Sequence, residues 1–261
     1  MSINEAAYPL TGLLIGLLVG LTGIGSGAFL TPLLMLTFGI APVTAIGTNL
    51  VFTSVTKAAG TVVHGMRGTI DWKVVGGLAM GSVPTALATV LVMSRIGMTS
   101  ALNSPFVVNL LLGGVLFQAS LAVFFRPWIL EWAGEHMSGM PETSLTRWTI
   151  LVGAALGILV VLTTVGAGAV GATALLILYP KLPVARVVGS IIAYAVPMSL
   201  IGVLGHWAWG SIDFGLALAL LAGSIPGIII GSLLSSRLSE ELLRPALAAA
   251  LMIASFEMMT A

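Results

Sequence analysis

The chain of 261 residues is 58% hydrophobic and only 7% charged, with a mean hydropathy of +1.12. A soluble domain carries roughly a quarter charged residues, so this composition excludes a soluble globular fold. The formal net charge of +1 comes with no basic run for nucleic acid and no acidic tail, and the lack of cysteine excludes disulfides, thiolate metal sites and cysteine nucleophiles.

Long charge-free tracts predict an all-α, polytopic membrane protein. Each tract is long enough to cross a hydrocarbon core of roughly 30 Å, which takes about 20 helical residues. The tracts lack the alternation of apolar and polar residues that barrel strands require, which favours helices. The first ten residues lack the basic start of a signal peptide, so we expect the first helix to be retained. In chain order we expect helices at residues 8–38 with an interruption at 23–27, then 43–66, 72–94, 105–125, 148–179, again interrupted, 184–205, 214–236 and 243–259.

The second half of the sequence resembles the first, which predicts two tandem repeats of about four helices each. We place the first repeat at 1–125, a polar linker at 126–147 and the second repeat at 148–261. Trp128 and Trp132 in the linker favour a short interfacial helix. Such a repeat is typical of secondary transporters, whose substrate site lies near the midplane where the halves meet. The sequence leaves open whether the repeats are parallel or inverted, and how the termini are oriented. The matched pairs include Gly25 with Gly166, Gly27 with Gly168, His64 with His206 and Asp71 with Asp213.

A glycine-rich segment interrupts the first helix of each repeat. The pieces on either side of each break are too short to span a bilayer alone. Backbone N–H groups at the start of the following half-helix lack helical partners and, together with the helix dipole, favour an anion. We therefore predict a two-sided anion site that includes Gly25, Ser26, Gly27, Gly166 and Gly168. The alternative is that these small residues only let helices pack closely.

Polar residues also lie in the helices that follow the breaks. Thr48, Asn49 and Ser190 stand near the helix starts, where their side chains either cap the helix or contact a solute. Lys57 lies inside the helix at 43–66, and its counterpart in the second repeat is Ser199. A charge at this depth is costly unless it faces a cavity or a partner, so we predict that Lys57 attracts or holds an anion. The alternative is that its long side chain reaches the headgroups.

One histidine lies at the end of the second helix of each repeat, and an aspartate follows it in the sequence. His64 with Asp71, and His206 with Asp213, are candidates for proton coupling, because histidine titrates near neutral pH. We favour the alternative, a polar collar in which the aspartates cap the next helices. Two histidines without a third or a cysteine are weak evidence for a metal site, and we expect no metal and no other cofactor.

Three stretches carry a resemblance to a known family: Gly23 to Gly27 leading to Pro32, Pro42 to Asn49, and His64 to Trp72. They resemble the sulfite exporter TauE/SafE family of membrane permeases, and the likeness covers nearly the whole chain. The resemblance implies an anion permease for sulfite, sulfonates and related sulfur oxyanions, usually moved outward. The second repeat has Thr164 and Ala167 where the first has Gly23 and Ser26, which argues against a symmetric site.

We therefore expect a secondary transporter, not an enzyme, that exports a small anion such as sulfite or an organosulfonate, coupled to the proton gradient. It would be a multi-pass protein of the bacterial inner membrane with no nucleic-acid partner. The alternatives are an anion channel or an importer of another solute and, remotely, an intramembrane protease using Ser26. A cation carrier would need acidic residues inside the helices, and only Glu257 is a candidate. The sequence leaves open which anion moves and whether two copies form a homodimer.

Overall fold

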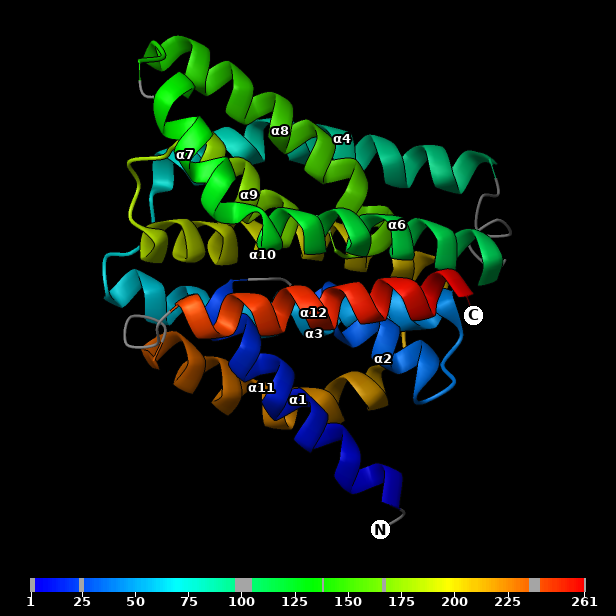
Figure 1. Cartoon of the computed structure of the whole chain (residues 1–261). Helices are drawn as coiled ribbons and strands as arrows, with labels where there is room; N and C mark the ends of the chain where they lie inside the picture. Colours follow the sequence, from blue (N-terminus) through cyan, green and yellow to red (C-terminus); the bar gives the residue numbers. More distant parts are fainter. Residues whose placement is uncertain are drawn as a thin grey trace.

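The computed structural model describes residues 3–23, 26–96, 105–137, 139–165, 168–234 and 240–260, and every regular element among them is a helix. The all-α prediction is therefore confirmed (Figure 1). The helices are α1 (Ile3–Thr22), the short 3-10 helix η1 (Ser26–Ala28), α2 (Leu30–Leu36), α3 (Pro42–Met66), α4 (Trp72–Ile96), α6 (Pro105–Phe124), α7 (Arg126–Met137), α8 (Glu142–Thr163), α9 (Ala169–Leu178), α10 (Val184–Ala208), α11 (Phe214–Leu234) and α12 (Glu240–Thr260).

Both predicted helix interruptions are present. In the first half α1 ends at Thr22 and helical structure resumes at Ser26; in the second, α8 ends at Thr163 and α9 begins at Ala169. The segment predicted as a polar linker is itself largely helical, because it forms α7 and because α8 begins at Glu142, earlier than the predicted start at 148. Trp128 and Trp132 are exposed on α7, as an interfacial helix would have them.

Five helices in the described part of the chain are long and apolar enough to cross a membrane. Large apolar side chains such as Leu91, Leu204 and Leu218 are exposed on their outer faces, the surface that a bilayer covers. α3 is different, because it carries the polar residues Asn49 and Lys57 and packs against α10, α11, α2 and η1. Its polar face is thereby turned inward, away from lipid.

Helices that match in the two halves run antiparallel. On the α3–α10 interface Gly60 faces Ile192 while Gly202 faces Leu50, so the two helices run in opposite directions. α6 and α12 do the same: the hydroxyl of Ser255 donates to the carbonyl of Gly113 (2.8 Å) and that of Ser120 to the carbonyl of Ala248 (2.9 Å). An inverted repeat would produce this arrangement. The duplication and its boundaries stay predictions.

Two further pairs, α1 with α11 and α4 with α8, run parallel and touch through glycines. A Cβ on Gly12 or Gly16 would collide with the α11 backbone at Leu220 or Ser224, and one on Gly153 or Gly157 with the α4 backbone. Close backbone approach at small residues is the usual packing of membrane helices. Figure 1 shows the α4–α8 pair on one side of the bundle and the α1–α11 pair on the opposite side, with α3, α6, α10 and α12 between them.

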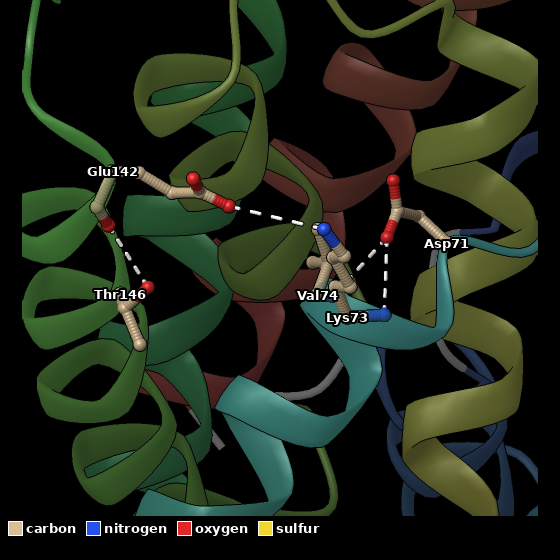
Figure 2. Close-up of polar contacts among 5 residues, drawn as sticks. All are labelled: Asp71, Lys73, Val74, Glu142 and Thr146. Atoms are coloured by element: carbon tan, nitrogen blue, oxygen red, sulfur yellow. Dashed lines mark hydrogen bonds and ion pairs between the residues drawn. The ribbon is translucent and has the colours of Figure 1, made fainter.

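The α4–α8 pair begins at a common, exposed end of the bundle (Figure 2). Asp71 caps α4 through its Oδ1, which accepts the backbone N–H groups of Lys73 (3.1 Å) and Val74 (3.3 Å). Lys73 Nζ lies 3.9 Å from Glu142 Oε1, and both side chains are more than four-fifths exposed (92% and 85%). Such exposed pairs contribute only about 0–1 kcal/mol, so the glycine contacts rather than this ion pair hold the two helices together.

Candidate functional site

The two helix breaks meet inside the bundle. Gly27, in η1, lies against Thr164, the residue that ends α8: a Cβ on Gly27 would collide with the backbone and hydroxyl of Thr164. Thr164 has a left-handed backbone (φ 62°), as does Gly23 (φ 69°), its match after α1. A non-glycine residue held in this conformation costs about 1–3 kcal/mol, so the surrounding contacts must hold it in place. The two breaks are therefore adjacent at Gly27 and Thr164.

A cluster of buried polar side chains joins these breaks to α3. We call it the Asn49 cluster; its members are Ser26, Thr31, Asn49, Thr53 and Thr164. The Asn49 Nδ2 group donates to Thr31 Oγ1 (2.7 Å) and Thr164 Oγ1 (3.1 Å). The Asn49 Oδ1 atom accepts from Ser26 (2.9 Å) and Thr53 (3.2 Å). The Ser26 and Thr53 hydroxyls also contact each other, and those of Thr31 and Thr164 lie 3.1 Å apart. One amide therefore connects α3 to both breaks.

The Asn49 cluster satisfies most of its own hydrogen-bonding capacity. The amide uses both of its N–H hydrogens and both acceptor sites within the cluster. Of the Thr31 and Thr164 hydroxyls, one donates to the other, which leaves a single hydroxyl hydrogen for any further partner. The cluster accordingly fixes the geometry of the breaks and has few donors left for a ligand.

Lys57 supplies the donors that the cluster lacks. It follows Thr53 by one helical turn on α3, so both residues lie on the same face of that helix. Lys57 is only 1% exposed, and within the described part of the chain its Nζ atom has no hydrogen-bond partner. The ammonium is buried and does not extend to the surface, contrary to the alternative that it reaches the headgroups. An unpaired buried ammonium with three N–H donors is the strongest anion-attracting group near the breaks.

Thr48 and Ser190 hold the halves together at the two ends of the α3–α10 pair. The Ser190 hydroxyl accepts the backbone N–H of Asp71 (2.9 Å), and the Thr48 hydroxyl accepts that of Asp213 (3.1 Å). Each hydroxyl therefore accepts a backbone N–H at the start of a helix in the opposite half. The alternative interpretation of the sequence was that these side chains cap their own helices. Their predicted contact with a solute stays a prediction.

The histidines and aspartates lie at the same two ends but do not contact each other. His64 Nδ1 is 2.8 Å from the Thr69 hydroxyl, and His206 Nδ1 is 2.9 Å from the Ser211 hydroxyl. Asp213, like Asp71, accepts a backbone N–H of its own helix, that of Leu216 (2.9 Å). Across the described residues no hydrogen bond or ion pair links either histidine to either aspartate. The arrangement agrees with a polar collar in which the aspartates cap helices.

The remaining predicted site residues are the break glycines. Gly25 and Gly166 lie outside the described residues. Gly168 directly precedes α9, and its carbonyl accepts the backbone N–H of Ala172 (2.8 Å). The described residues contain no group of three or more His, Asp or Glu placed to hold a metal ion. Thr31, Thr53 and Thr164 were not among the predicted site residues. The spacing of Thr53, four residues from both Asn49 and Lys57, was a usable signal, whereas Thr31 gave none.

The fold and the site together define a class of protein. Long apolar helices surround a buried polar cluster between the two halves of the chain, the arrangement of a multi-pass membrane transporter. The chain belongs to the sulfite exporter TauE/SafE family, whose family model matches residues 8–258.

Two relatives from Bacillus subtilis (strain 168) agree with this assignment. The chain is 34% identical over 250 residues to the probable membrane transporter protein YjnA, covering 95% of this chain and 97% of the relative. It is 26% identical over 220 residues to the probable membrane transporter protein YdhB, covering 82% and 83% of the two chains. No solved structure matches the chain. The protein is therefore a TauE/SafE family membrane transporter.

Proposed function

We propose that this protein is a secondary transporter that exports a small anion, sulfite or another sulfur oxyanion such as an organosulfonate, across the bacterial inner membrane, coupled to the proton gradient. The observation that carries the proposal is the buried, unpartnered ammonium of Lys57 beside the Asn49 cluster. The family name supports sulfur oxyanions as the substrate class.

The charge of the site favours an anion over a cation. Removing one partner from a buried ion pair leaves an uncompensated charge that costs about 3–5 kcal/mol, so the Lys57 site is best satisfied when an anion occupies it. Among the described residues that are buried, the ionisable side chains are Lys57, His64, His206 and Tyr194, and none is a carboxylate. Glu257, the acidic residue that a cation carrier would have used, is exposed on α12.

The closure of the site favours a carrier over a channel. The side chains that join the breaks are fully enclosed, since Thr31 and Asn49 have no exposed surface and Ser26 has only 1%. An open anion pore would leave such residues in contact with water. An enzymatic role for Ser26 also lacks support, because its hydroxyl partners are Asn49 and Thr53 rather than a general base.

The test measures efflux from proteoliposomes that are loaded in turn with sulfite, methanesulfonate, sulfoacetate and taurine. Wild-type protein should transport at least one sulfur oxyanion saturably, and Lys57→Met, which keeps the length of the side chain but removes the charge, should abolish that flux. Lys73→Met is the matched control, because Lys73 is exposed at the start of α4. Equal flux in wild-type and Lys57→Met vesicles would overturn the proposal.

A further inference from the structure

We propose that Lys57 carries the proton as well as the anion, so that a single side chain couples the two fluxes. The ammonium form binds one singly charged anion. When the anion leaves, the ammonium N–H bond breaks, the proton passes to water on that side, and the neutral amine remains. This inference rests on the proposed function and assigns its coupling group.

The candidates that the sequence suggested for coupling each form a hydrogen bond outside the Asn49 cluster. The Nε2 atoms of His64 and His206 are buried and, like Lys57 Nζ, have no hydrogen-bond partner among the described residues. His64 and His206 bond to hydroxyls at opposite ends of the α3–α10 pair, and Asp71 and Asp213 bond to backbone N–H groups. These contacts are matched in the two halves, as expected for a structural feature. They also lie at the ends of α3 and α10, whereas Lys57 lies well inside α3.

No other titratable group of the described helices packed against α3 takes the place of Lys57. α11, α2 and η1 contain no ionisable side chain, and α3 itself adds only His64. α10 contributes Arg186, Tyr194 and His206. Arg186 is exposed near the start of α10, and Tyr194 is a neutral phenol in the core formed with α4 and α8 residues. None of these groups is a buried carboxylate that could neutralise the ammonium.

The balance of charge then sets the stoichiometry. A buried ammonium without a counter-ion is costly, and so is an anion without a cation. With one singly charged anion bound to the ammonium, the occupied site is neutral; with the amine deprotonated, the empty site is neutral too. Neither form carries a net charge through the membrane, so each anion moves together with one proton in the same direction and the cycle is electroneutral. Export by this cycle is driven by the outward anion gradient and carries one proton out with each anion, so a cytoplasm more alkaline than the outside opposes it. A doubly charged anion such as sulfate leaves one negative charge unbalanced and is disfavoured, so sulfite binds as hydrogensulfite, and sulfoacetate, which carries two charges, binds more weakly than methanesulfonate.

The first experiment compares Lys57→Arg with wild type, using methanesulfonate because it carries one fixed charge and no proton of its own. A guanidinium keeps the positive charge but does not lose its proton in proteins. Lys57→Arg should therefore still exchange labelled for unlabelled methanesulfonate, while net flux driven by a pH gradient falls about tenfold or more. Wild type should move one proton per anion, with no dependence on membrane potential. Proton-driven net flux that survives in Lys57→Arg would overturn the inference.

A second measurement uses wild-type protein alone and does not depend on how the variant folds. Calorimetric titration with methanesulfonate in buffers of different ionisation enthalpy counts the protons taken up on binding. At alkaline pH, where the empty site is the neutral amine, one proton should be taken up per anion. Binding with no proton uptake at any pH would overturn the inference. His64→Gln and His206→Gln should leave the proton count unchanged. If wild type neither binds nor moves any sulfur oxyanion, the proposed function itself fails. If wild type transports the anion but takes up no proton on binding, only the coupling role of Lys57 fails.

Discussion

Helices α3 and α10 occupy matching positions in the two halves, yet they differ in chemistry. Both span 25 residues, and each ends with a histidine bonded to a hydroxyl. In their middles the helices diverge: α3 carries Asn49, Thr53 and Lys57, where α10 carries Ile191, Ala195 and Ser199. The shared ends set how the halves pack, whereas of these two helices only α3 contributes polar residues from its middle to the site. The two helices thus share the contacts at their ends, but the polar residues in the middle of α3 have no counterparts in α10.

The helices that pack against α3 and α10 differ in the same way, because a side-chain hydrogen bond present beside α3 is missing beside α10. Thr56 of α3 is hydrogen-bonded to Ser224 of α11 (2.6 Å). At the matching position of α10, Met198 has no hydroxyl, and Ser82 of α4 instead donates to the carbonyl of its own Leu78 (2.8 Å). If this comparison is correct, substitutions in the middle of α3 should have large effects without an equivalent in α10. Substitutions at the ends should have small and equal effects in the two halves.

The largest expected difference lies between Lys57 and Ser199. Lys57→Ser places the α10 residue in α3 and removes the three N–H donors of the ammonium. Because a hydrogen bond to a charged group contributes about 1.5–3 kcal/mol, methanesulfonate binding should weaken roughly 10- to 100-fold. Ser199→Ala should leave binding unchanged, since this hydroxyl already donates to the carbonyls of Ala195 and Val196. Titration calorimetry on the purified variants measures the methanesulfonate affinity of each. Equal losses of affinity in Lys57→Ser and Ser199→Ala would refute the claim that α3, and not α10, binds the anion.

The next expected effect is that of Asn49→Leu, which replaces an amide by an apolar side chain of similar size. Loss of the amide deprives the surrounding hydroxyls of their shared partner, and each buried group left unpaired costs about 1–3 kcal/mol. The midpoint of thermal unfolding in detergent should fall, and anion flux should fall with it. Ser54→Ala is the control on the same helix, because its hydroxyl donates only to the carbonyl of Val51. An unfolding midpoint equal to that of Ser54→Ala would show that the cluster contributes little.

Gly27→Ala should have an intermediate effect, because the added methyl group meets the backbone of Thr164. Overpacking of a tight contact costs typically about 1–3 kcal/mol, and here it would push the two breaks apart. Flux should fall more than stability does, since the contact is at the site. Gly114→Ala, on α6 with nothing within 4 Å of the added atom, should change neither. The assays are the same flux and unfolding measurements; a harmless Gly27→Ala would mean that the breaks need not touch.

The smallest effects should come from the ends of the helices. Thr48→Val and Ser190→Ala each remove one hydrogen bond to an aspartate backbone in the opposite half, worth about 1 kcal/mol. The two variants should lower the unfolding midpoint by similar amounts and leave methanesulfonate binding nearly intact. A binding loss in one of them that approaches that of Lys57→Ser would extend the site to that end of the bundle.

Much of the fold was predictable from the sequence for simple physical reasons. Charge-free tracts of sufficient length identify helices, and glycine-rich segments within two of those tracts identify the breaks. Lys57 was identifiable because a charge inside an apolar helix is costly and needs a reason. The capping role of Asp71 and Asp213 followed from their place directly before a helix.

Other features depend on tertiary contacts that the sequence does not encode locally. The contact of Gly27 with Thr164 joins residues of opposite halves, and Thr31, which bonds to Asn49, looks like any threonine in an apolar helix. The antiparallel pairing of α3 with α10 was also unpredictable, because basic residues are spread evenly between the loops of the two sides. The segment at 126–147 was expected to carry a short interfacial helix; it is more helical than that, because α7 spans Arg126–Met137 and α8 begins at Glu142, and the polar residues of these turns gave no periodic apolar pattern.

An experimental structure of the protein with bound methanesulfonate most directly tests whether an anion meets the Lys57 ammonium beside the Asn49 cluster. We predict density for the sulfonate group with an oxygen about 2.7–2.9 Å from Lys57 Nζ, the range of a charge-assisted hydrogen bond. Density for the anion at His64 or His206, with Lys57 unoccupied, would contradict the account.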